Sequence, residues 1–124
     1  MIQTTVMDVE ELRSFCLGLP HCTEDTPFDV DTLAFRVHGK IFALTSIADN
    51  NAVNLKCNPE RAIQLREQFS AVTPGFHMNK THWNTVLFNS DLKDSEILNL
   101  AQHSYELVFS SLPKKLKNPT ITND

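Results

Sequence analysis

Apolar residues recur every three or four positions over residues 9–19, the spacing that places side chains on one face of a helix. Asp8 precedes this run and is a typical N-cap, because its carboxylate can accept a hydrogen bond from the first helical turn. Gly18 and Pro20 are residues that end helices. The pattern predicts a first helix over residues 9–19.

The pattern then changes to alternation, which is typical of strands. Residues 33–37 and 40–46 are two such runs, joined by the two-residue turn His38-Gly39, and predict a β-hairpin. Residues 53–57 form a third run, with apolar side chains on one face and Asn54 and Lys56 on the other.

Two further helices and one strand complete the pattern. Asn58 followed by Pro59 is a strong helix start, because Asn caps and Pro suits the first helical position. Residues 83–88 predict a strand. The last helix begins near Asp94 with an apolar position every three or four residues, and Pro113 ends it.

This order of elements predicts an α+β fold in which a mainly antiparallel, twisted sheet packs against helices. We expect residues 1–113 to form one compact domain and residues 114–124 to be a flexible tail.

Composition sets limits on compartment and partners. Hydrophobic residues make up 41% and charged residues 21% of the 124 residues, which excludes wholesale disorder. No run approaches the roughly 20 apolar residues of a membrane helix, and the first residues lack a secretory signal. We expect a cytoplasmic monomer without a membrane partner. Its three cysteines, Cys16, Cys22 and Cys57, are expected to be free thiols.

The charge is unevenly distributed along the chain. The net charge of −4 argues against nucleic acid as a partner. However, residues 1–31 carry seven acidic residues against Arg13 alone, whereas the remainder carries ten basic and eight acidic residues. An anionic ligand is therefore expected at the middle or the end of the chain.

The least ordinary segment, residues 74–85, combines histidines, a lysine, amides and the only tryptophan without any acid. Such groups can neutralise phosphate and stack on bases. Alternatively, Trp83 fills the core while His77 and Asn84 satisfy backbone groups. A metal site is not favoured, because His77 and His82 are five positions apart and lack the i, i+4 spacing of a zinc helix.

Catalytic chemistry has weaker support. Glu24 and Asp25 are adjacent carboxylates after the first helix, but neighbours on an extended chain point apart, so a capped turn with solvated acids is the simpler interpretation. The sequence has no nucleophile elbow and no phosphate-binding glycine loop, which favours a non-enzymatic role without a cofactor.

Several segments resemble the MmcQ/YjbR family, above all the string His-Met-Asn-Lys-Thr-His-Trp-Asn-Thr-Val over residues 77–86. The resemblance implies a CyaY-like, frataxin-like fold and DNA binding by a "double wing" of β-hairpins. The chain departs from the family at Phe76, often Tyr, and at His21, usually Gly. The other matching segments are residues 11–20, 23–28, 39–43, 53–57, 104–108 and 112–115.

The leading hypothesis is therefore a DNA-binding protein of modest, salt-dependent affinity. Its predicted contact residues are Lys56, Arg66, His77, Asn79, Lys80, His82, Trp83 and Asn84. The alternative is a small-ligand-binding or enzymatic domain. Its pocket would lie between Glu24 and Asp25 on one side and His77, Lys80 and His82 on the other. A third reading, iron binding by the acidic start at Asp8, Glu10 and Glu11, rests on fold analogy alone.

Overall fold

The structure is a computed structural model that describes residues 7–75 and 78–114. Two sequence-based predictions therefore fall outside the described residues: the contact residue His77 and nearly all of the tail, residues 115–124.

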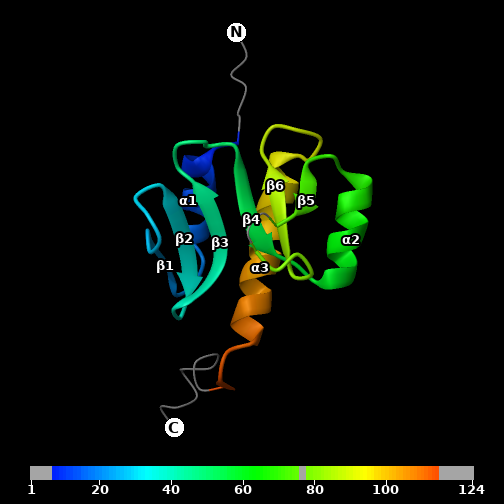
Figure 1. Cartoon of the computed structure of the whole chain (residues 1–124). Coiled ribbons are helices and arrows are strands. Elements are labelled where there is room, and N and C mark those ends of the chain that lie inside the picture. The colour runs from blue at the N-terminus through cyan, green and yellow to red at the C-terminus, as the bar shows by residue number, and fades with distance from the viewer. Residues whose placement is uncertain (1–6, 76–77, 115–124) are drawn as a thin grey trace.

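Within these residues, six strands form one sheet in the order β1-β2-β3-β4-β6-β5, and every neighbouring pair is antiparallel (Figure 1). The strands are β1 (Cys22–Asp25), β2 (Thr32–Val37), β3 (Lys40–Ser46), β4 (Ala52–Lys56), β5 (Val72–Pro74) and β6 (Trp83–Leu87). The helices are α1 (Val9–Leu17), α2 (Pro59–Gln68) and α3 (Asp94–Ser110). The predicted α+β class with an antiparallel sheet is confirmed.

The predicted helix starts and the predicted hairpin are also confirmed. The Asp8 carboxylate accepts a 2.8 Å hydrogen bond from the Glu11 N–H, and the Asn58 side chain caps α2. His38 (φ 48°) and Gly39 (φ 84°) both adopt positive φ. Two-residue turns of this kind match the twist of antiparallel strands, so they favour the β2–β3 pairing.

The helices within residues 7–75 and 78–114 cover one face of the sheet and leave the other open. Helix α3 packs across β2, β3 and β4, α1 contacts both α3 and β1, and α2 lies beside the edge strand β5. Figure 1 shows α1 and α3 behind the sheet. The core between them is apolar and includes an edge-to-face contact of Phe42 with Tyr105, whose ring centroids are 5.4 Å apart. Other buried members of this core are Leu12, Cys16, Phe35, Leu55, Val86, Ile97 and Val108.

We call the opposite face of the sheet the open face. Strand register places Leu44, Asn54 and Thr85 side by side across it, because Leu44 pairs with Asn54 and Asn54 pairs with Thr85. Lys56 and Trp83 pair in the same way further along β4 and β6. This face carries polar side chains such as Asn54, Thr85 and Lys56 together with apolar ones such as Leu44 and Trp83.

Two short strands of the sheet, β1 and β5, were not predicted from the sequence. Strand β1, four residues long, lies where a capped turn was expected, and β5, three residues long, lies where a loop was expected. Neither has a run of alternating apolar residues; both form because a neighbouring strand supplies backbone partners. Helix α1 also ends two residues earlier than predicted. None of the helices in the described ranges is long and apolar enough to cross a membrane.

Candidate nucleic-acid interface

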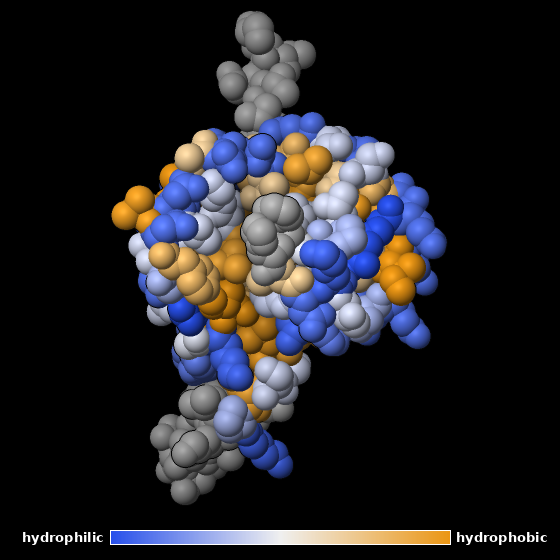
Figure 2. Space-filling model, viewed as in Figure 1, coloured by the Kyte–Doolittle hydropathy of each residue, from blue (hydrophilic) through white to orange (hydrophobic). Residues whose placement is uncertain are grey.

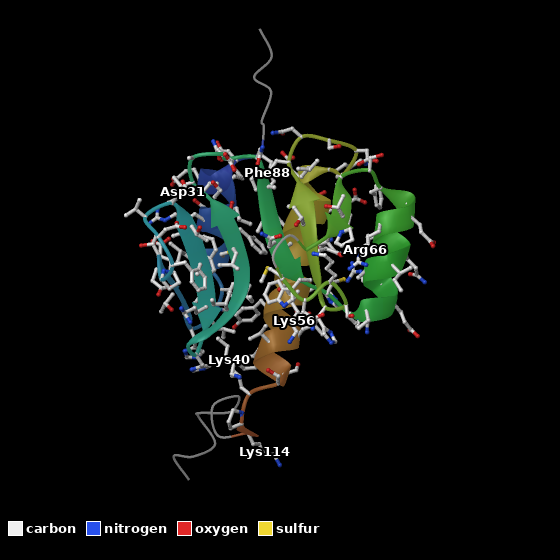
Figure 3. All side chains as sticks on the ribbon, viewed as in Figure 1. Asp31, Lys40, Lys56, Arg66, Phe88 and Lys114 are labelled. Atoms are coloured by element: carbon white, nitrogen blue, oxygen red, sulfur yellow. The ribbon has the colours of Figure 1, made fainter. Side chains whose placement is uncertain are left out.

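Basic side chains gather at one end of the sheet. Strand β3 begins at Lys40, and β4 ends at Lys56, which pairs with Trp83 at the start of β6. The Cys57 N–H donates a 2.7 Å hydrogen bond to the His82 carbonyl, which brings the segment before β6 to the same end. In Figure 3, Lys40 and Lys56 lie in the lower half of the view with Lys114 below them. We call this set the basic end: Lys40, Lys56, Arg61, Lys80 and Lys114.

Acidic side chains gather at the opposite end. Helices α1 and α3 both begin there, and their first turns carry acids, as the helix dipole favours. The turns that follow β1, β3 and β6 add further carboxylates, and Asp31 marks this end in Figure 3. The acidic end comprises Asp8, Glu10, Glu11, Asp29, Asp31, Asp49, Asp91, Asp94 and Glu96. The chain is acidic overall, yet its charge is segregated along one axis.

Arg66 of α2 organises the segment between β5 and β6. Its Nε donates a 2.7 Å hydrogen bond to Asn84 Oδ1, and its Nη2 donates to the carbonyl oxygens of Lys80 and Trp83. Lys80 Nζ donates to the Gly75 carbonyl at 3.0 Å, which closes the loop on itself. Charge-assisted hydrogen bonds therefore hold the backbone of this segment at Gly75, Lys80 and Trp83.

These bonds change the roles of two predicted contact residues. Asn84 is only 2% exposed and its carbonyl oxygen accepts a hydrogen bond from Arg66, so its side chain faces the interior of the fold and is not presented at the surface. Arg66 is half-buried, and its Nε and Nη2 already donate to Asn84 and to the backbone of the loop. Asn79, Lys80 and His82 are exposed at the loop surface. Lys56 and Trp83 are half-buried on the open face beside them.

The predicted pocket between the acids and the basic loop is not formed by the described residues. Glu24 and Asp25 lie on β1, and three strands separate β1 from β6. Arg13 binds both Glu24 oxygens, at 2.8 and 2.7 Å, and this hydrogen-bonded pairing lowers the pKa of the Glu24 carboxyl. Arg36 pairs with Asp25 at 2.9 Å. Both acids are paired with arginines within the fold, so the described residues do not form the predicted pocket between these acids and the basic loop.

Comparison with known proteins identifies the family. The YjbR family profile matches residues 17–107. The chain is 36% identical over 110 residues to the uncharacterised protein YjbR of Escherichia coli (strain K12), covering 88% of this chain and 93% of that protein. The chain belongs to the YjbR family.

Solved structures show the same YjbR-family architecture. A crystal structure of a Deinococcus radiodurans protein with the DUF419 domain superposes with a TM-score of 0.86 at 35% identity, covering 98% of this chain and 92% of that one. A Pseudomonas syringae protein gives a TM-score of 0.71 at 27% identity, covering 82% of this chain and 98% of its own. The family resemblance and the fold class predicted from sequence are thus confirmed.

The thiols of this YjbR-family chain are poorly suited to nucleophilic chemistry. Cys16, Cys22 and Cys57 are free, as predicted. Burial raises the pKa of all three, that of Cys22 to about 11, so the thiolate is scarce at neutral pH. In the part of the chain that the structure describes, no three His, Cys, Asp or Glu side chains are grouped as metal ligands.

Lys40, Arg61 and Lys114 were not among the residues predicted from sequence. Lys40 follows directly on the predicted hairpin turn, and Arg61 lies in the first turn of the predicted second helix. The sequence contains a signal for both residues. Antiparallel pairing places the start of β3 and the end of β4 at the same end of the sheet, and α2 begins directly after β4. That these residues lie at the same end as Lys56 and Lys80 could be seen only once the order of the strands was known.

Proposed function

We propose that this YjbR-family protein binds DNA through its basic end. The observation that carries the proposal is the segregation of charge. Lys40 and Lys56 lie at one end of the sheet, together with the segment before β6 that carries Lys80, and most of the described carboxylates gather at the other end. A phosphate backbone is attracted to the first end and repelled by the second, so the acidic half fixes the orientation of the protein on DNA.

The basic end also carries groups suited to sugars and bases. His82 and Asn79 are exposed in a loop whose backbone Arg66 holds in place. A fixed loop loses little conformational entropy when it binds. With about three to five phosphate contacts, the logarithm of the affinity should fall with the logarithm of salt concentration with a slope of roughly −2.7 to −4.5.

The test compares matched charge removals at the two ends. Lys56→Gln and Lys40→Gln each remove one positive charge from the basic end, whereas Lys93→Gln removes one from an exposed site at the start of α3. Binding of a labelled duplex is measured by fluorescence anisotropy from about 20 to 200 mM salt. Each basic-end variant should weaken binding and reduce the salt slope by about 1.

The Lys93→Gln variant should bind as the wild type does. Equal losses in all three variants would mean that only net charge matters. An absence of salt-sensitive binding at about 20 mM salt would refute the proposal.

A further inference from the structure

A pocket of about 370 Å³ lies on the open face of the sheet, apart from the acids considered above. Leu44 of β3 and Asn54 of β4 form its base, while Phe28 of the β1–β2 loop and Met78 of the β5–β6 loop stand at its sides. Figure 2 shows apolar surface in this region of the face, bordered by hydrophilic residues. Thr32, Thr45 and Ser46 complete the lining.

The lining is neutral and offers few free polar groups. Thr45 Oγ1 donates to the Ala52 carbonyl at 2.7 Å, and Ser46 Oγ donates to Asp31 at 2.6 Å. Asn54 Oδ1 accepts a 2.5 Å hydrogen bond from the Thr85 hydroxyl. The Asn54 amide N–H groups have no partner among the described residues, so they are the donors available to a ligand.

The side walls suit a flat ring. Phe28 is 67% exposed, unusual for a phenylalanine, and would lose this exposure if a ring stacked on it. Met78 supplies a polarizable thioether, which makes favourable contacts with aromatic rings. A neutral, planar ring with a hydrogen-bond acceptor at its edge matches all of these groups.

Lys56 connects this pocket with the basic end. It lies two positions beyond Asn54 on the same strand and therefore on the same face, about 7 Å further along. This is roughly the separation of a base from its own phosphate. The positive charge of Lys56 thus lies where a bound nucleotide would have its phosphate. The neutral pocket lining lies where the nucleotide would have its base.

We propose that the pocket receives an unpaired nucleobase whose phosphate is bound by Lys56. The inference rests on the proposed DNA binding and makes it specific, because a base inside a duplex cannot enter a pocket without leaving its stack. The protein accordingly binds single-stranded DNA more tightly than duplex. Uncharged nucleosides offer the same ring chemistry, so the experiment separates a free nucleoside from a base within a strand.

Anisotropy at low salt with a labelled 12-nucleotide single strand and its duplex tests the proposal. The wild type should bind the single strand about tenfold more tightly, since one stacked base contributes on the order of 1–3 kcal/mol. Phe28→Ala should remove most of this preference without changing duplex binding. Val30→Ala is the matched control in the same loop, because Val30 is 92% exposed and outside the pocket lining.

A second pair of variants fills the pocket. Leu44→Trp should also abolish the single-strand preference. Leu87→Trp is its control, since Leu87 is 39% exposed on the same face but outside the lining. Because Phe28 is at the surface, Phe28→Ala keeps the test decisive if Leu44→Trp fails to fold.

Each outcome decides one of the two proposals. Equal binding of single strand and duplex, unchanged by Phe28→Ala, would overturn the pocket proposal and leave DNA binding intact. If neither DNA binds, the proposed function fails, and NMR titration with thymidine and adenosine at millimolar concentration decides the pocket. Shifts of the Asn54 amide and the Met78 methyl that Phe28→Ala removes would support a nucleoside site, and unchanged signals would refute it.

Discussion

At the residue scale, His21 is one of four residues other than glycine that adopt positive φ in the described part of the chain. Its φ of 61° lies in the left-handed region, which costs an L-residue with a side chain about 1 kcal/mol and costs glycine almost nothing. Its ring lies 4.6 Å from that of His38, so a stacking contact offsets part of the cost. A glycine at this position would adopt the same conformation without strain.

His21→Gly and His21→Ala therefore separate strain from stacking. Both variants lose the contact with His38, but only glycine relieves the strain. We expect His21→Gly to be more stable than His21→Ala by about 1 kcal/mol, measured by urea unfolding. Equal stability of the two variants would show that the turn carries no strain.

Arg66, predicted from the sequence as a DNA contact, holds the loop before β6 in place. Arg66→Ala leaves the buried Asn84 side chain without its donor and releases the carbonyl oxygens of Lys80 and Trp83. We expect a loss of about 1–3 kcal/mol in the free energy of unfolding. Arg61→Ala, an exposed arginine of the same helix, should cost less than about 0.5 kcal/mol. Similar losses in both variants would contradict the positioning role.

At the element scale, the pairing of β5 with β6 depends on Gly75. The Gly75 N–H donates a 2.8 Å hydrogen bond to the Trp83 carbonyl, and an added Cβ would lie 2.9 Å from Trp83 Cβ and 3.0 Å from Trp83 O. No side-chain rotation relieves a contact with backbone. The two strands would have to move apart.

Gly75→Ala should therefore destabilise the protein by about 1–3 kcal/mol. Gly18→Ala is the control, because its Cβ would meet the carbonyl oxygens of Phe15 and Ser14 at ordinary distances of 3.4 and 3.6 Å, and its φ is −79°. Thermal unfolding should show a clear loss for Gly75→Ala and little change for Gly18→Ala. A Gly75→Ala protein as stable as the wild type would disprove the close approach.

The junction of α2 and α3 makes stability depend on pH. His103 Nε2 accepts a hydrogen bond from the Asn58 N–H at 3.3 Å, which only the neutral ring can do. Burial, and then the charge of Arg61, lower the pKa of His103 below its usual value. As pH falls below the ordinary histidine value, the unfolded chain binds the proton first, so the folded state loses stability.

Lowering the pH from 7.5 to 5.5 should therefore reduce the urea midpoint, and His103→Gln should reduce this dependence. His82→Gln, a substitution at an exposed histidine, should leave it as in the wild type. An identical pH dependence in His103→Gln and the wild type would exclude this junction as its source.

At the scale of the whole molecule, charge segregation predicts which surface would contact DNA under the proposed function. NMR titration with a short duplex at low salt should shift backbone signals at Lys40, Lys56, Lys80 and His82. Signals around Asp31 and Asp91, at the opposite end, should stay in place. Shifts of equal size at both ends would contradict a single oriented interface.

The sequence by itself determined the elements whose signals are local. The His38-Gly39 turn, the Asn58-Pro59 helix start and the apolar stripe of α3 all depend on residues within a few positions of one another. Such preferences act through backbone sterics and nearby hydrogen bonds, so a linear pattern records them. The family resemblance was likewise contained in the chain.

Only the tertiary structure decided how these elements combine. Strands β1 and β5 exist because a neighbour supplies their hydrogen bonds, and Arg66 reaches Asn84 across 18 positions of sequence. The division into a basic and an acidic end and the pocket on the open face follow from strand order. A contact between distant segments forms through the packing of the whole chain, which leaves no periodic or local signal at either residue.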